Sequence, residues 1–148
     1  MAQNRKKREK QEEKKRLQTM RCPYCGAPME IRPAGEIYRK KTSTERLLVC
    51  SRYPACDTYA QFIPGTDELL GSPADPALRR LRSRTHRSFD DVWKKGYMSR
   101  SDAYLWMADF LGLRRDQAHI ARLDAYRCRR VIAKCEALRR LRARQAEA

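Results

Sequence analysis

The fold is decided by two short cysteine motifs, Cys22-Pro23-Tyr24-Cys25-Gly26 and Cys50-Ser51-Arg52-Tyr53-Pro54-Ala55-Cys56. The two-residue gap in the first motif lets both thiolates reach one metal ion, and the glycine that follows relieves backbone crowding. The second motif adds two sulfurs after 24 intervening residues, enough for a β-hairpin. Four thiolates form a soft, closed ligand set, which predicts one structural zinc ion bound by Cys22, Cys25, Cys50 and Cys56. The alternative is a pair of disulfides, which an intracellular setting disfavours.

Strands are predicted on both sides of the polar stretch that separates the motifs. Residues 29–32 and 45–49 have strand composition, and a third short strand is expected at 58–62. A ribbon of this size buries few side chains, so we expect the metal ion to supply much of its stability.

The second half of the chain has the periodicity of helices. Asp75-Pro76 predicts the start of a first helix, Ser99 with Asp102 has the spacing of a capping box, and a third helix is expected over 124–144. The predicted inward faces are Leu78, Leu81, Thr85, Phe89, Val92 and Trp93, then Ala103, Trp106, Met107 and Phe110, then Cys128, Val131, Ile132, Cys135, Leu138 and Leu141. The two late cysteines are therefore interpreted as core residues rather than ligands.

These patterns predict an α+β protein with four parts. A basic flexible or helical tail at 1–20 precedes a four-cysteine zinc ribbon, built on a β-hairpin, at 21–64. A linker at 65–75 leads to a three-helix α domain at 76–148 with a basic C-terminal helix. Residues 1–19 have Leu17 as their only large aliphatic side chain after Met1, so the tail is either an arm that seeks phosphates or a solubilising extension.

The charge balance points toward a polyanionic partner. The chain has 148 residues, 34 Lys or Arg against 18 Asp or Glu, and a net charge of +16. The surplus is +5 over residues 1–20 and +6 over 121–148, so both ends are basic. No apolar run approaches the roughly 20 residues of a membrane span, and no secretory signal follows the basic start, so a cytoplasmic location is expected.

The ribbon mixes cations with flat rings, a combination that suits unpaired nucleic-acid strands because rings stack on bases while cations contact phosphates. We predict a sequence-tolerant nucleic-acid-binding protein that prefers single-stranded or unpaired DNA over duplex DNA and RNA. In the alternative interpretation, many of the rings fill a thin ribbon core. The predicted contact residues are Arg32, Arg39, Lys40, Lys41, Arg52, Tyr53, Tyr59, Arg79 and Arg82.

Two resemblances extend this interpretation. The Cys-Ser-x-Tyr-Pro-x-Cys form of the second motif resembles the four-cysteine ribbons appended to bacterial type IA topoisomerases, which bind single-stranded DNA. That resemblance implies metal roles for the four cysteines and base stacking by Tyr53 and Tyr59. It implies no catalysis, because 148 residues have no room for the strand-cleaving domains. The stretch from His86 to His119 is similar to a zinc-finger-containing family of unknown function found in bacteriophage and prophage genomes, which implies a phage origin.

Two other classes of function stay open from the sequence. The chain could be a phage adaptor or inhibitor that docks on a host replication, transcription or ribosomal complex. A metal-dependent nuclease is the third interpretation, because His86 and Asp90 are four residues apart and His119 could join them. No nuclease, Walker or nucleophile motif surrounds these residues, so we expect a protein that is not an enzyme.

Overall fold

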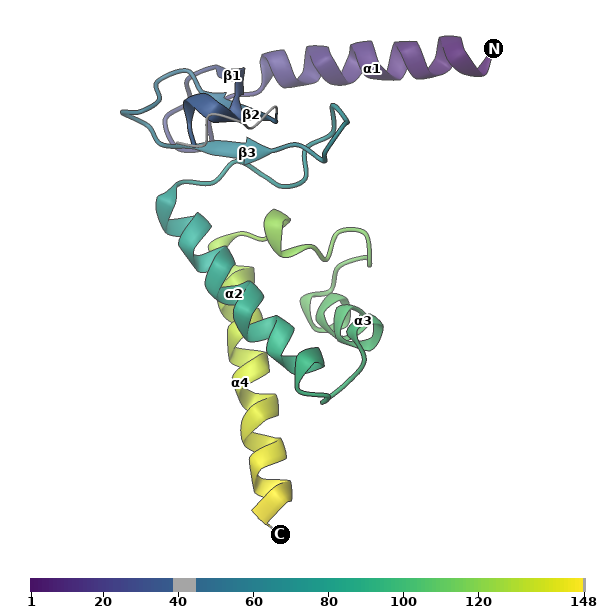
Figure 1. Ribbon diagram of the computed structural model, residues 1–148, viewed down its shortest axis with the longest axis vertical. Coiled ribbons are helices and arrows are strands. Elements are labelled where there is room, and N and C mark those ends of the chain that lie inside the picture. The colour runs from purple at the N-terminus through teal and green to yellow at the C-terminus, as the bar shows by residue number, and fades with distance from the viewer. Residues whose placement is uncertain (39–44, 148) are drawn as a thin grey trace. The chain divides into compact units, whose positions relative to one another are not determined.

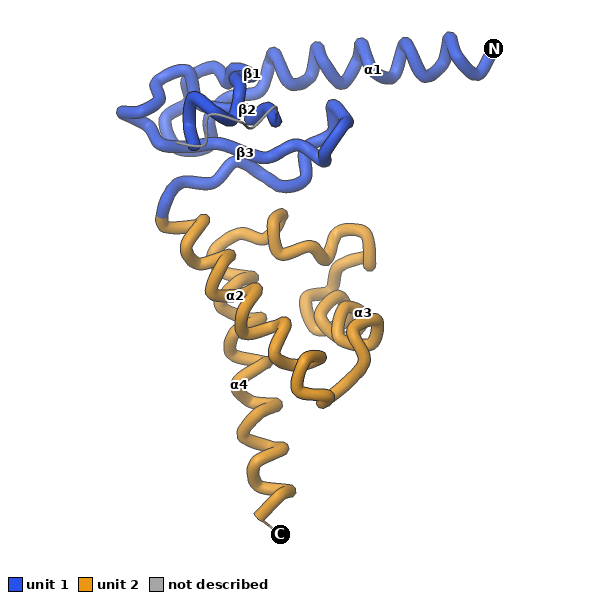
Figure 2. The backbone as a smooth tube through the Cα atoms, viewed as in Figure 1, with its two compact units in different colours: residues 1–76 blue, residues 77–148 orange. Residues whose placement is uncertain are grey.

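The chain divides into two compact units, Met1–Pro76 and Ala77–Ala148 (Figure 2). The computed structural model describes residues 1–38 and 45–147. Its elements are α1 (Ala2–Thr19), β1 (Met29–Pro33), β2 (Arg46–Cys50), β3 (Tyr59–Gln61), α2 (Pro76–Lys94), α3 (Arg100–Leu111) and α4 (Ala125–Glu147), with short 3-10 turns at Ala34–Glu36 and Ile120–Arg122 (Figure 1). The predicted α+β class is confirmed.

The strands of unit 1 form an antiparallel sheet in the order β1-β2-β3. Met29 pairs with Cys50 across the first hairpin, and Val49 pairs with Tyr59 across the second. Successive side chains of a strand point to opposite faces, so the central strand β2 contributes to two separate apolar clusters. Leu48 and Cys50 join the cluster on one face, while Leu47 and Val49 join the cluster on the other.

Helix α1 is exposed along most of its length and is anchored near its C-terminal end. Leu17 is its one buried residue, at 2% exposure. This side chain packs in the same cluster as Met29, Leu48 and two of the cysteines. A helix with so little apolar surface relies on the packing of Leu17 and on its continuity with the ribbon.

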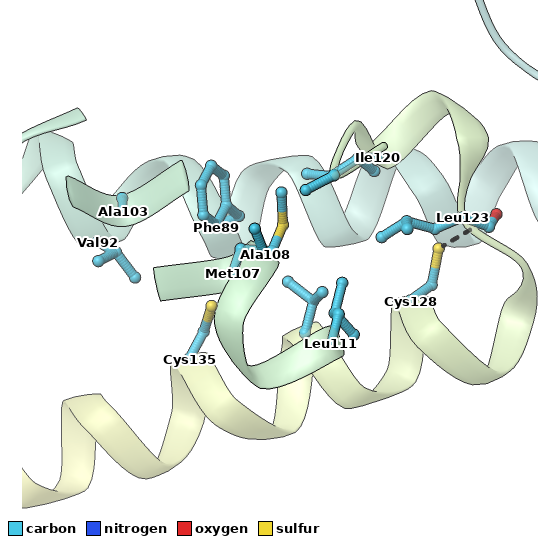
Figure 3. Close-up of a cluster of buried hydrophobic side chains, with 12 residues drawn as sticks. Phe89, Val92, Ala103, Met107, Ala108, Leu111, Ile120, Leu123, Cys128 and Cys135 are labelled. Carbon is cyan, nitrogen blue, oxygen red and sulfur yellow. Dashed lines mark hydrogen bonds between the residues drawn. The ribbon is translucent and has the colours of Figure 1, made fainter. Parts of the chain in front are cut away.

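Unit 2 encloses one apolar core between α2, α3 and α4 (Figure 3). Phe89 and Val92 of α2 are fully buried, as are Cys128 and Cys135 of α4. The late cysteines are thus core residues, as predicted. Ser99 caps α3 by accepting a hydrogen bond from the Asp102 backbone N–H at 3.1 Å, which is the predicted capping-box position.

The buried face of α3 differs from the predicted one. Ala103 and Met107 are buried as expected, but the rest of the buried face is Ala108 and Leu111. Trp106 and Phe110 are half-buried and meet edge to face with ring centroids 4.8 Å apart. Residues 103, 107 and 111 are spaced four apart and so lie on one stripe of the helix, which explains why Leu111 is buried in place of Phe110. At the other end of the unit, Leu141 is 53% exposed because the last turns of α4 extend beyond α2 and α3 (Figure 1).

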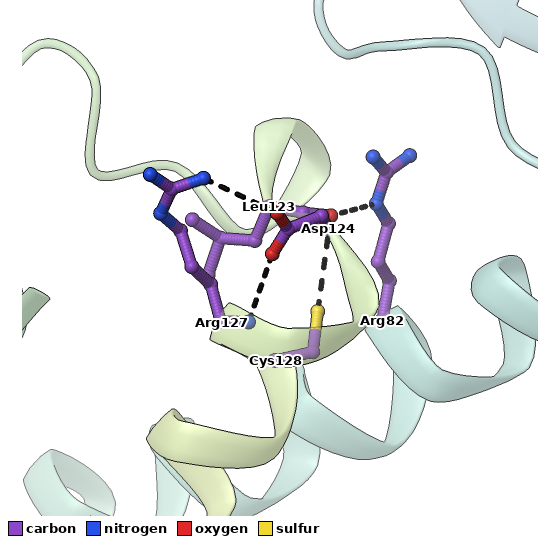
Figure 4. A network of polar contacts seen from close by, with 5 residues as sticks. All are labelled: Arg82, Leu123, Asp124, Arg127 and Cys128. Atoms are coloured by element: carbon purple, nitrogen blue, oxygen red, sulfur yellow. Dashed lines mark hydrogen bonds and ion pairs between the residues drawn. The ribbon is translucent and has the colours of Figure 1, made fainter. Parts of the chain in front are cut away.

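Arginines brace the helices of unit 2 by donating hydrogen bonds to backbone carbonyls of other segments. The Arg82 Nε donates to the Leu123 carbonyl at 3.0 Å (Figure 4). The other braces run from Arg130 Nη2 to Phe110 O at 2.9 Å, from Arg139 Nη1 to Ser88 O at 3.2 Å, and from Arg142 Nη2 to Tyr97 O at 3.1 Å. Part of the positive charge of this unit therefore serves its own fold.

Candidate metal centre

The two cysteine motifs bring four sulfur atoms together at one end of the sheet. The ligand atoms of Cys22, Cys25, Cys50 and Cys56 all lie within 4.8 Å of one another. The Cys22 and Cys56 sulfurs are 3.7 Å apart, and the Cys25 and Cys50 sulfurs are 3.4 Å apart. A tetrahedral zinc site with Zn–S bonds of about 2.3 Å has sulfur–sulfur edges of roughly 3.8 Å. The observed sulfur–sulfur distances therefore fit a zinc ion in tetrahedral coordination.

The first motif forms a tight knuckle because its backbone turns around the Cys22 sulfur. The Gly26 N–H donates to the Cys22 carbonyl at 2.9 Å, and the Cys22 N–H donates to the Ala27 carbonyl at 2.8 Å. Gly26 has a φ of 76°, in the left-handed region that glycine adopts without a steric penalty. Its position after the second cysteine lets the chain leave the knuckle and enter β1.

The second motif begins at the end of β2 and returns to β3. The Tyr53 N–H donates to the Cys50 carbonyl at 2.9 Å, and the Cys56 N–H donates to the Arg52 carbonyl at 3.2 Å. The fully buried Thr58 follows, with its Oγ1 3.4 Å from the Cys56 sulfur. Sequence reasoning did not single out Thr58, although its place two residues after the last ligand was the available signal.

The protonation of the cysteines shows why a cation is needed. Burial alone would raise the pKa of the Cys22 thiol, but hydrogen bonds from the backbone N–H groups of Cys25 and Tyr24 outweigh it and lower the pKa to about 6. At Cys50, burial is the largest effect and, with the neighbouring sulfurs, raises the pKa to about 12. One thiolate therefore forms readily, while the full set of four requires a metal ion to offset their mutual repulsion.

An apolar shell surrounds the sulfur cluster. Leu17, Met29, Leu48 and Ala60 are buried against the ligands Cys22 and Cys50. This shell excludes water from one side of the site, and four protein ligands leave no coordination position for a reacting water. The arrangement is that of a structural metal site.

The predicted contact residues of the ribbon lie in different environments. Arg52 is exposed, whereas the Arg32 Nε is 2.8 Å from the Glu36 carboxylate and its guanidinium carbon lies 5.8 Å from the centre of the Tyr53 ring. Tyr53 and Tyr59 are half-buried beside the Leu47 and Val49 cluster, so each contributes part of its ring to the thin core. Arg39, Lys40 and Lys41 lie outside the described residues.

The two predicted contact residues of the helical unit are both half-buried on α2. Arg82 uses its Nε in the brace to Leu123, while Arg79 lies one turn earlier on the helix. In the same network, the Asp124 carboxylate accepts from the Arg127 backbone N–H at 2.9 Å and caps α4 (Figure 4). The hydrogen bond from Arg82 to the Leu123 carbonyl therefore fixes the orientation of Arg82 within unit 2.

The candidate nuclease residues do not converge on a metal site. Within residues 1–38 and 45–147, the four cysteines are the only group of three or more His, Cys, Asp or Glu side chains close enough to share an ion. Asp90 accepts a hydrogen bond from the Trp93 indole N–H at 3.3 Å. The His119 side chain is mostly exposed, but neighbouring atoms still remove part of its water shell. This partial desolvation, followed by the nearby Arg122 and Arg115, lowers its pKa.

The fold and the site define a small zinc-binding protein with a four-cysteine ribbon and a separate helical unit. The chain belongs to the family described as a zinc-finger-containing domain, DUF3268, whose model matches residues 18–138. The four cysteines are the ligand set for one structural zinc ion. Comparison with curated proteins and with solved structures finds no match. Among the described residues, no helix is both long enough and apolar enough to span a membrane.

Proposed function

We propose that this zinc-finger protein binds nucleic acid with little sequence preference and favours unpaired DNA over duplex DNA and RNA. The observation that carries the proposal is the solvated positive charge of α1. This helix holds eight Lys or Arg against three Glu and buries only Leu17. In the described structure, only Arg5 and Arg16 of these cations form close ion pairs, with Glu9 and Glu13.

Such a helix has little to gain from the protein's own core, so its charge is available to an external polyanion. Lys and Arg side chains that neutralise phosphates release condensed counterions, which gives affinity without base recognition. The alternative role of α1 as a solubilising extension would leave strand affinity unchanged when its charge is removed.

The metal end of the ribbon supplies a second supporting feature. The two cysteine motifs meet at the sulfur cluster. The exposed side chains of Tyr24, Arg21 and Arg52 lie in or next to these motifs. Tyr24 is 48% exposed, which leaves ring surface for stacking on an unpaired base. Zinc would thus organise this surface without taking part in any reaction.

The test is fluorescence anisotropy of the zinc-loaded chain with a labelled thymidine strand of roughly 20 nucleotides, longer than the roughly 4–16 nucleotides of a common single-strand site. We expect binding that weakens steeply between about 50 mM and about 200 mM salt. Arg52→Gln should weaken it, whereas the matched Arg46→Gln should not, because Arg46 is ion-paired with Asp67 at 2.7 Å. A flat salt dependence, or equal effects of the two substitutions, would contradict the proposal.

Purification gives an independent comparison with the adaptor alternative. A nucleic-acid-binding protein should carry material that absorbs at about 260 nm until high salt or nuclease removes it. Recovery of a stoichiometric host protein instead, with no strand binding, would favour the adaptor. The proposal assigns no catalytic role to the protein. A phage origin is part of the proposal only because the sequence resembles a family found in phage genomes.

A further inference from the structure

Unit 2 displays cations over aromatic rings at the junction of α2 and α3. Arg100 has its guanidinium carbon 5.6 Å from the centre of the Trp93 ring and 5.5 Å from that of Tyr104. The Arg115 guanidinium carbon lies 4.5 Å from the Tyr104 centre, and the Lys94 ammonium lies 5.5 Å from the Trp93 centre. We call these five residues the aromatic–cation cluster.

The two rings form a fixed platform. Trp93 is half-buried and its indole N–H donates to the Asp90 carboxylate at 3.3 Å. Tyr104 is half-buried and meets the fully buried Phe89 edge to face, with ring centroids 4.9 Å apart. Because both rings are tied to the core of unit 2, the cations that stack on them have defined positions.

The three cations of the cluster are exposed and, in the part of the chain that the structure describes, none of them is ion-paired with a carboxylate. Their sequence neighbours behave differently. Lys95 lies 3.9 Å from Asp91, and the Arg114 Nε lies 3.3 Å from Asp116. Asp91 and Asp116 therefore pair with other cations, and Asp90 accepts from the Trp93 indole N–H, so none of these three carboxylates forms an ion pair with a stacked cation.

This arrangement concentrates unneutralised charge. Arg100 and Arg115 share the Tyr104 ring, so their guanidinium carbons are no more than about 10 Å apart, a distance comparable to the screening length at physiological salt. In water at this separation the repulsion between two unit charges is weaker than a cation–π contact, so the Tyr104 ring can hold both guanidinium groups against it. An anion bound over the cluster would be attracted to both cations.

We propose that the aromatic–cation cluster is a second contact surface for an unpaired nucleic-acid strand. The guanidinium groups of Arg100 and Arg115, backed by rings, present flat faces on which bases can stack, while the same groups and Lys94 contact phosphates. A duplex would offer the phosphates but keep its bases stacked inside. The inference rests on the proposed function and assigns it a site on the helical unit.

The first experiment compares two triple variants that change net charge equally, measured with the labelled thymidine strand and the full zinc-loaded chain. Lys94→Gln, Arg100→Gln and Arg115→Gln together remove the cluster cations. Lys95→Gln, Arg114→Gln and Arg140→Gln remove cations that are ion-paired, the last with Glu136. Since each single-strand phosphate contact contributes roughly 0.7 to the log–log salt slope, the cluster variant should lower the slope by about 2 and the affinity about tenfold. The control variant should change the affinity less than about twofold.

The second experiment separates stacking from charge. Arg100→Lys with Arg115→Lys keeps both charges but removes the planar groups. We expect an unchanged salt slope, several-fold weaker binding of the thymidine strand, and unchanged binding of an abasic strand of the same length. This variant also keeps the proposal testable if the Gln variant melts early, because it preserves the charge pattern of unit 2.

The outcomes distinguish this inference from the function on which it rests. Strand binding by the wild-type chain, with equal losses in the cluster and control variants, would overturn the cluster as a site while the proposed function stands. No difference between the Lys variant and wild type on either strand would overturn the stacking role. Absence of any strand binding by the wild-type chain would overturn both proposals.

Discussion

The two units of this protein solve the same problem of stability in different ways. Unit 1 has two small apolar clusters on either face of a three-stranded sheet, and its strands are joined at one end by four cysteines. Unit 2 has one core with Phe89 at 0% exposure and arginines that tie its helices together. The difference shows that one basic chain of this length can use a metal site to stabilise one unit and an apolar core to stabilise the other.

Arginines pair with carboxylates in both units, but those of unit 2 have an additional role. In unit 1, Arg32 and Arg46 contact carboxylates, and Arg52 is exposed. In unit 2, Arg130 and Arg139 donate to backbone carbonyls that helix geometry leaves without partners or that face the neighbouring helix. The net charge of +16 therefore overstates the charge that an external polyanion can contact.

Loss of the metal should have the largest effect and should be confined to unit 1. Structural zinc contributes about 10–16 kcal/mol in small finger domains, more than a core of this size supplies. We expect Cys50→Ser, or chelation, to abolish zinc binding and to collapse the amide signals of the ribbon in a nitrogen–proton correlation spectrum, while residues of α2 to α4 keep theirs.

The matched control is Cys135→Ser, which changes a buried cysteine of α4 that is not a ligand. This variant should keep stoichiometric zinc by elemental analysis and keep the ribbon signals. Folded strands in a zinc-free sample, or zinc loss from the control, would break the contrast between the units.

A core truncation should give the converse result. Phe89→Ala removes a fully buried ring from the unit 2 core and should destabilise that unit by about 3–5 kcal/mol. Urea unfolding followed by helix circular dichroism should show the earlier transition, and zinc content should stay unchanged. If the ribbon unfolded at the same urea concentration as the helices, the two units would behave as one cooperative body.

An arginine brace should have a smaller effect that depends on its partner. Arg139 donates to both the carbonyl and the hydroxyl of Ser88, at 3.2 and 3.1 Å. Arg139→Met should therefore cost about 1–2 kcal/mol of unit 2 stability in chemical denaturation. Arg140→Met, which alters a neighbouring exposed side chain paired with Glu136, should be nearly neutral. Equal costs would show that the braces add nothing beyond charge.

The smallest predicted effect is a pH dependence from His119. Its pKa in the folded chain is lowered from 6.5 by partial desolvation and by Arg122 and Arg115. The unfolded chain thus binds a proton at a higher pH than the folded chain, so acidification through and below about pH 6.5 should reduce the stability of unit 2. His119→Gln should remove this part of the dependence in melting curves recorded from neutral to mildly acid pH, and an identical profile in the variant would contradict it.

The metal ligands and the main elements were predictable because they depend on local chemistry. A Cys-x-x-Cys-Gly turn specifies its own backbone, Ser99 with Asp102 specifies a helix start, and Gly112 ends α3 with a φ of 66°. These signals need only a few adjacent residues. The zinc ribbon and the capping box followed from them, while the core position of Cys128 followed from the helical periodicity of 124–144.

Features that depend on long-range packing were not predictable in the same way. The shift of the α3 face to Ala108 and Leu111 depends on how three helices meet. The use of Arg82 as a brace requires Leu123, which lies 41 residues further along the chain. The aromatic–cation cluster likewise joins residues of α2, α3 and the loop after α3, and no short motif announces it.

The burial of Leu17 affects how this domain should be delimited. The family model begins at residue 18, one position after a side chain that is 2% exposed beside the ligands Cys22 and Cys50. A shortened chain that starts at residue 18 would uncover the apolar surface around the ion and invite self-association. A chain that starts one helical turn earlier would keep Leu17 packed over the metal site and would still lack most of the basic helix α1.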